Sequence, residues 1–102
     1  MKVEFDTDLT ARVGARAASK DFGDLLFSAL ERRVKTGVVS QDAQAETVSA
    51  AFCIDAANAE GAIAAATQVF RECLAAAGGP SRPELTEITV ALTKLKPSAQ
   101  TA

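Results

Sequence analysis

Apolar and polar positions alternate in three stretches of the chain, residues 2–9, 46–56 and 85–95. In the first stretch the apolar positions are Val3, Phe5 and Leu9, and the charged positions are Lys2, Glu4, Asp6 and Asp8. A period of two is typical of a strand that buries one face. A weaker strand begins at Val38 and Val39 and fades into a polar stretch. The pattern therefore predicts four strands.

The alternation also assigns each side chain of the two longer strands to a face. The core-facing positions are Val48, Ala50, Phe52, Ile54 and Ala56 in one strand, and Ile88, Val90 and Leu92 in the other. The opposite positions are Thr47, Ser49, Ala51, Cys53 and Asp55 in one strand, and Glu87, Thr89, Ala91 and Thr93 in the other. Because successive side chains of a strand point to opposite faces, these outward residues should share one surface of the sheet.

Two segments show the helical spacing of apolar residues. In residues 21–36 the apolar stripe is Phe22, Leu25, Leu26, Ala29 and Leu30. In residues 59–77 it is Ile63, Ala66, Phe70, Cys73, Leu74 and Ala77. We expect Asp21 and Asn58 to cap the N-terminal ends, Gly37 to stop the first helix and Gly78-Gly79 to stop the second.

The elements follow one another in the order β-α-β-β-α-β. Two helices covering one face of a four-stranded antiparallel sheet satisfy every apolar face with right-handed crossovers. We therefore expect an α+β, ferredoxin-like sandwich with the first and third strands in the middle. Residues 1–96 should form the single domain, and residues 97–102 should be a flexible tail.

The composition argues against several classes of function. The 102 residues include no histidine, the commonest general base and zinc ligand. The formal charge of −2 gives no overall attraction to nucleic acid or to an anionic membrane. We expect a protein that is not an enzyme and that holds no cofactor or metal.

The beginning of the chain lacks the apolar run of a signal peptide, and no stretch approaches the ~20 apolar residues of a membrane span. We expect a cytoplasmic protein with reduced thiols and no membrane partner.

The two cysteines should lie on opposite sides of the sheet. Cys73 belongs to a helical core stripe, whereas Cys53 has the opposite parity to Phe52 and Ile54. A disulfide requires Cα atoms within ~7 Å, which this arrangement does not allow. We expect no disulfide within the chain.

The uncovered face of the sheet is the main candidate for function. Its residues are small and mostly uncharged, and we take the candidate interface to be Thr47, Ser49, Ala51, Cys53, Thr89 and Ala91. One interpretation is a solvated sheet, and the other is a flat surface covered by a second copy or by another protein. We expect a small protein-interaction protein, homodimeric through this face.

A basic stretch, residues 10–20, is the second candidate. Arg12, Arg16 and Lys20 stand four residues apart without an intervening acid, so a helical turn would align them. One interpretation is a solvated connection. The alternative function is a regulatory module that binds a small anion or nucleic-acid phosphate there.

The stretch TVSAAFCIDAANAEGAIAAATQVFRECLAAAGGPSRPELTEITV, residues 47–90, resembles a recurring pattern of strand, alanine-rich helix and closing strand. It is similar to the second half of small uncharacterised ferredoxin-like proteins of high-GC actinobacteria and their phages. The resemblance implies the fold and a bacterial or bacteriophage origin. It assigns no catalytic residue. We also expect a bacterial or phage protein as a partner if the chain is not a homodimer.

Overall fold

The structure, a computed structural model, describes residues 2–80 and 82–93. Its elements follow the predicted order, with a short 3-10 helix added after the first strand. They are β1 (Val3–Arg12), η1 (Gly14–Ala18), α1 (Lys20–Glu31), β2 (Gly37–Asp42), β3 (Thr47–Ala56), α2 (Ala59–Ala76) and β4 (Glu84–Leu92). The predicted tail, residues 97–102, lies outside the described residues.

The four strands form one antiparallel sheet in the order β2-β3-β1-β4, so the prediction that the first and third strands are central is confirmed. β1 and β2 both run antiparallel to β3 and are therefore parallel to each other. In the same way, β3 and β4 are parallel with β1 between them. The fold is thus two interleaved β-α-β units, each with one strand of the other unit inserted between its own two strands.

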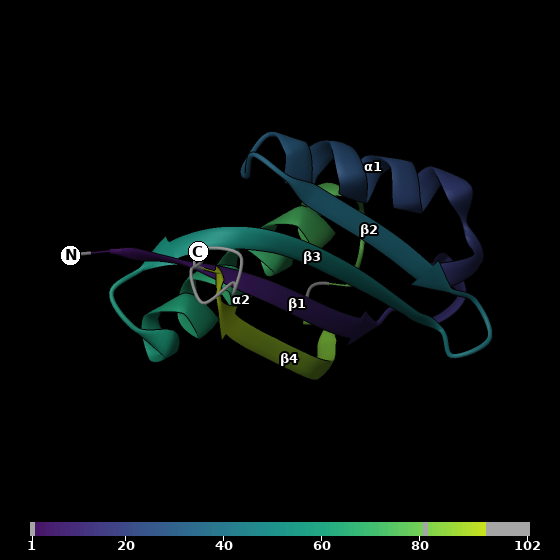
Figure 1. Cartoon of the computed structure of the whole chain (residues 1–102). Coiled ribbons are helices and arrows are strands. Elements are labelled where there is room, and N and C mark those ends of the chain that lie inside the picture. The colour runs from purple at the N-terminus through teal and green to yellow at the C-terminus, as the bar shows by residue number, and fades with distance from the viewer. Residues whose placement is uncertain (1, 81, 94–102) are drawn as a thin grey trace, which may run out of the picture.

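Both helices pack on the same face of the sheet, and the other face is left open (Figure 1). The predicted inward positions of the central strands form the core with α1 and α2. The largest side chains that are almost fully buried are Leu9, Leu26, Leu30, Val48, Phe70, Cys73 and Leu74. Thr7, which the alternation did not assign, lies on this inner face and donates a hydrogen bond from Oγ1 to the carbonyl oxygen of Phe52 at 2.7 Å. A buried hydroxyl is tolerated here because it has a partner.

The first helix differs from the prediction at both ends. Its N-cap is Ser19, whose Oγ accepts a hydrogen bond from the backbone N–H of Phe22 at 3.2 Å, so the assignment to Asp21 was wrong. The helix ends at Glu31 and not at residue 36. Gly37 does not stop the helix either, because it is the first residue of β2. A Cβ at this position would lie 2.5 Å from a methyl carbon of Leu30, so glycine allows the strand to approach the helix.

Two predicted core positions of the helices are exposed. Leu25 is 53% exposed and Ile63 is 41% exposed. In each helix the buried stripe is narrower than the apolar one, because a single layer of sheet covers only part of the helical surface. The neighbour Ala62 takes the buried position in α2 that the prediction gave to Ile63.

The two ends of the second helix agree with the prediction. Oδ1 of Asn58 accepts a hydrogen bond from the backbone N–H of Gly61 at 2.8 Å and so caps the N-terminus. At the other end Gly78 has φ of 85°, a conformation that favours glycine, and the N–H of Gly79 returns to the carbonyl oxygen of Leu74.

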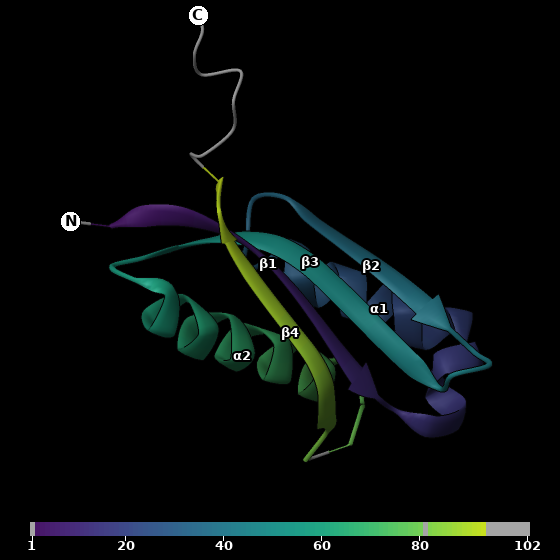
Figure 2. The same ribbon diagram turned by 60° about the horizontal axis from the view of Figure 1, so that its bottom comes forward.

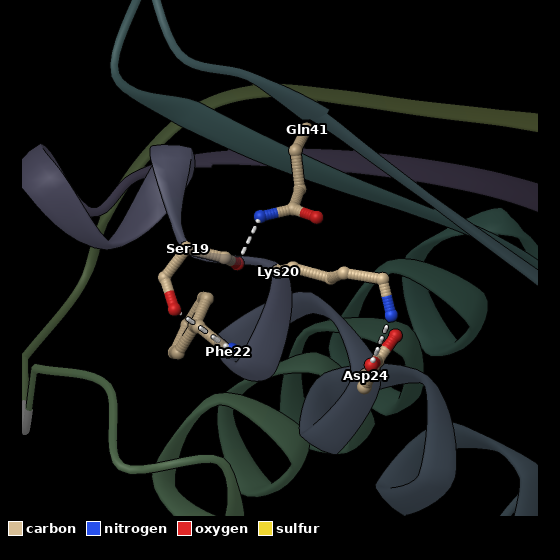
Figure 3. A network of polar contacts seen from close by, with 5 residues as sticks. All are labelled: Ser19, Lys20, Phe22, Asp24 and Gln41. Atoms are coloured by element: carbon tan, nitrogen blue, oxygen red, sulfur yellow. Dashed lines mark hydrogen bonds and ion pairs between the residues drawn. The ribbon is translucent and has the colours of Figure 1, made fainter.

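A small network of polar contacts joins η1, α1 and β2 (Figure 3). Nε2 of Gln41 donates to the carbonyl oxygens of Ala17 at 3.1 Å and Ser19 at 2.7 Å. The side chain of Gln41 lies directly against Gly23, where any Cβ would collide with it. Glycine at position 23 therefore leaves room for the Gln41 side chain beside the start of α1.

The last strand is an edge strand with one irregularity. Its register with β1 shifts between Thr10 and Ala11, so that Ala11 faces Leu85 while Thr10 faces Glu87. A bulge of this kind adds one residue to a strand and keeps both flanking segments in register. The predicted strand continued to residue 95, but residues 94 and 95 lie outside the described part. No helix among the described residues is long and apolar enough to cross a membrane.

Candidate functional site

The open sheet face brings all six predicted interface residues together around the central strand β1. From β3, Cys53 lies opposite Asp6, Ala51 opposite Asp8, Ser49 opposite Thr10 and Thr47 opposite Arg12. From β4, Ala91 lies opposite Asp6 and Thr89 opposite Asp8. The predicted residues therefore form two flanks, and the outward residues of β1 run between them.

A cluster of polar contacts occupies one end of this face. The Cys53 thiol donates a hydrogen bond to Oδ1 of Asp6 at 3.1 Å, and Oγ1 of Thr93 donates to the same oxygen at 2.8 Å. The hydrogen bond to Asp6 raises the pKa of Cys53, and burial and the charges of Asp6 and Glu4 raise it further. The thiol therefore stays protonated and donates to the carboxylate, which is the opposite of an activated nucleophile.

At the other end of the face, the contacts between strands are one pair of hydroxyl groups and one ion pair. Oγ1 of Thr10 and Oγ of Ser49 lie 2.8 Å apart across the β1–β3 pair. Nε of Arg12 lies 3.7 Å from Oε1 of Glu84 at the end of the β1–β4 pair. Both side chains of this ion pair are exposed, so its contribution to stability is small.

Two shallow depressions meet beside Cys53. One, of about 210 Å³, lies on the open face and is lined by residues that include Asp6, Val38 and Ala51. The other, of about 290 Å³, lies around the end of α1, where Glu4 and Asp55 face Arg33 and Lys35. Cys53 and Thr36 line both depressions. Neither is enclosed enough to hold a small molecule away from water, so the face is better suited to a macromolecular surface.

The charge on the open face is one-sided. Among the described strand residues that point outward, seven carry carboxylates and one carries a guanidinium. The acidic residues are Glu4, Asp6, Asp8, Asp42, Asp55, Glu84 and Glu87, and the basic residue is Arg12. The chain as a whole has a formal charge of only −2, so the remainder of the molecule is correspondingly basic. The alternation assigned several of these acids to the outer side, but it could not show that they lie side by side.

The basic stretch does not form a shared cluster. Residues 10–20 do contain a helical turn, η1, but it does not align the three basic residues, because Arg12 lies at the end of β1, Arg16 lies in η1 and Lys20 begins α1. Each has its own partner. Arg12 pairs with Glu84, Nε of Arg16 donates to the carbonyl oxygen of Gly78 at 3.1 Å, and Nζ of Lys20 lies 3.2 Å from Asp24.

The two cysteines lie where the parity argument placed them. Cys53 is partly buried on the open face, Cys73 is buried in the core beneath the sheet, and both are free thiols. Burial raises the pKa of Cys73, the largest of the effects on that thiol, and the side chain behaves as a small apolar group.

The described residues contain no group of three or more histidine, cysteine or acidic side chains arranged to hold a metal ion. Sequence reasoning missed Val38, which is 65% exposed on the outer side of β2 opposite Ala51. It also missed Thr10 and Arg12 as parts of the face, although the alternation of Leu9, Ala11 and Val13 with polar neighbours could have revealed them.

No protein-family model, no curated protein and no solved structure matches this chain.

Proposed function

We propose that this protein acts by binding another protein through the open sheet face. The observation that carries the proposal is the chemistry of that face. Its flanks consist of small side chains, of which Thr47, Ser49, Ala51 and Cys53 are already partly buried. Small side chains allow a second surface to approach a sheet to ~10 Å without a loss of packing. A surface of this kind can bury a large flat area on a partner.

The charges favour a partner of particular chemistry. A row of carboxylates along the central strand attracts a surface that carries lysine or arginine side chains. A face-to-face homodimer would bring together two surfaces that each carry seven carboxylates and one guanidinium, and the approach of two surfaces of like net charge is unfavourable. Of the two occupants that the sequence allowed, a different and basic protein therefore has the stronger support. A bacterial or phage protein as that partner is part of the proposal, supported by the resemblance of residues 47–90.

The proposal also includes the fold family and the absence of catalysis. The two interleaved β-α-β units support assignment to the ferredoxin-like folds. The Cys53 thiol donates its hydrogen to Asp6, which supports a role in binding rather than in catalysis. The alternative function, binding of a small anion or phosphate by Arg12, Arg16 and Lys20, has less support because each of these side chains already contacts an acceptor.

The proposal can be tested with a photo-crosslinking amino acid at position Ala51. The variant is expressed in the cells in which the protein naturally occurs. Ala51 lies at the centre of the open face, between Asp8 and Val38. Position Ala64, exposed on α2, is the matched control on the far side of the molecule. We expect one basic protein to be crosslinked from position 51 and not from position 64. Equal crosslinking from both positions, or crosslinking only from position 64, would contradict the proposal.

A further inference from the structure

The edge of the sheet formed by β4 carries a second inference, which is independent of the open face. We infer that two copies of this chain associate by pairing their β4 strands antiparallel, about a twofold axis at Val90. The result is one continuous eight-stranded sheet. β4 lies at the end of the strand order and pairs with β1 alone, and no described residue pairs with its outer edge (Figure 2). The outer edge of β4 presents a row of backbone donors and acceptors with which an extended segment of another chain can pair.

Exposed apolar side chains flank this edge on the helix side. Ile88 and Leu92 point toward the helix layer, yet each is 39% exposed, because α2 covers only part of β4. Ile63 of α2 is 41% exposed on the helix that packs against this strand. Between the two, Val90 is partly buried against Phe5 and Ala62. A partner strand would therefore gain apolar contacts as well as backbone hydrogen bonds.

The side-chain sequence is self-complementary about Val90 over residues 87–93, which are the last six residues of β4 and Thr93 that follows it. Antiparallel pairing centred there places Ile88 of one copy opposite Leu92 of the other, and Val90 opposite Val90. On the open face it places Glu87 opposite Thr93, and Thr89 opposite Ala91. No two like charges face each other, and the apolar residues of both copies meet on the helix side. Cross-strand pairs of this type are the unit that stabilises a sheet. A second copy is thus the occupant that the edge fits, in keeping with the prevalence of twofold dimers.

The opposite edge is less suited to this role. β2 has six residues, and its inward positions are Gly37, Val39 and Gln41. Gln41 is already committed to the carbonyl oxygens of Ala17 and Ser19. The exposed Val38 points to the open face and not to the helix side. Pairing through β2 would bring together a single apolar pair, against three through β4.

Two complementary charge variants test both the surface and its register. In Ile88→Lys each new ammonium faces Leu92 of the second copy, and in Leu92→Glu each new carboxylate faces Ile88. Both positions are partly exposed in the isolated chain, so the fold should survive, which far-ultraviolet circular dichroism checks. We expect a wild-type dimer by sedimentation velocity and a dimer dissociation constant about tenfold higher or more for either variant. Val38→Lys, on the other edge, is the control and should leave the dimer unchanged.

Mixing the two variants gives the decisive result. A mixed dimer would place the new ammonium of one chain opposite the new carboxylate of the other, and would leave Leu92 opposite Ile88 at the second pair. We expect the mixture to form dimers where each variant alone is monomeric. A wild-type chain that stays monomeric at high concentration would overturn the inference. So would a dimer that survives Ile88→Lys, or a pair of monomeric variants that fail to form dimers when mixed. Because this readout needs no partner protein, its failure is distinguishable from failure of the open-face proposal.

Discussion

The thiol of Cys53 donates a hydrogen bond to Oδ1 of Asp6 at 3.1 Å, between the two central strands of the open face. The hydrogen bond joins the depression beside Val38 and Ala51 to the row of carboxylates on β1. Asp6 also accepts from Thr93, so one carboxylate of β1 contacts both β3 and the residue that follows β4. Because the hydrogen bond favours the protonated thiol, the reactivity of Cys53 reports on this arrangement.

The first prediction concerns that reactivity. Asp6→Asn removes the negative charge that strengthens the hydrogen bond from the thiol and disfavours the thiolate, so the pKa of Cys53 should fall toward its ordinary value. At mildly alkaline pH a larger share of the thiol is then ionised, and alkylation by iodoacetamide should be faster. The rate as a function of pH measures the shift. Cys73 is fully buried and should not react in the folded chain.

Asp8→Asn is the matched control, because Asp8 lies one row away on the same strand face and contributes no cause to the pKa of Cys53. An equal acceleration in both variants would show that the effect is general charge removal and not the hydrogen bond.

The raised pKa of Cys53 also makes the stability of the fold depend on pH. A raised pKa stabilises the folded chain below the ordinary thiol pKa, and this contribution is lost as pH rises through the folded value. In Asp6→Asn the free energy of unfolding should therefore decrease less as the pH rises through this range.

The second prediction is that replacing Gly23 by alanine lowers the stability of the protein, although alanine has the higher helix propensity. Replacing a glycine inside a helix by alanine normally stabilises a protein by about 1 kcal/mol. Here the new Cβ would collide with the Gln41 side chain and displace it from the carbonyl oxygens of Ala17 and Ser19. Two lost hydrogen bonds cost about 2 kcal/mol, so Gly23→Ala should be destabilising by about 1 kcal/mol. Urea denaturation measures the change.

The same substitution in a Gln41→Ala background provides the control. With the amide gone, the collision disappears and Gly23→Ala should recover its stabilising effect. A Gly23→Ala change that stabilises both backgrounds equally would show that Gln41 does not restrict this position.

The third prediction assigns a structural role to Arg16. Its guanidinium contacts the carbonyl oxygen of Gly78, just beyond the C-terminal end of α2, where a positive charge is favourable. Arg16→Ala should therefore lower the free energy of unfolding by about 1 kcal/mol. Arg71→Ala, on the exposed side of α2, is the control and should have a smaller effect.

Phosphate distinguishes this role from the alternative function. If Arg16 bound an anion with Arg12 and Lys20, added phosphate would raise the Tm of the wild type and not that of Arg16→Ala. We expect phosphate to change the two melting temperatures by the same amount. A stabilisation confined to the wild type would favour the anion site.

Much of the fold was predictable because alternation of side chains carries the same information as burial. The parity of Val48, Ala50 and Phe52 gave both the core side and the open side of β3. The end of β1 was not predicted, because the three basic residues at a spacing of four suggested a helical turn. The burial of Ala11 and Val13 shows that the alternation in fact continues through this stretch.

The limits of helix burial could not be read from the chain. Leu25 and Ile63 have the spacing of a core stripe, but how far a helix is covered depends on where it lies over the sheet. The same holds for Ile88 and Leu92, which point to the correct side and yet stay exposed at the edge. Strand register is also a tertiary property, so the contact between Cys53 and Asp6 could not be predicted from either strand alone.

The most direct test of the open face as a binding surface is the yield of crosslinked adduct from position Ala51 in two backgrounds. Asp8 lies opposite Ala51 and is exposed, so Asp8→Lys reverses one charge at the centre of the face without disturbing the core. We expect the adduct to be lost in Asp8→Lys and to fall with rising salt in the wild type. An adduct of unchanged yield in Asp8→Lys would contradict the account, because the acidic face would then not select its partner.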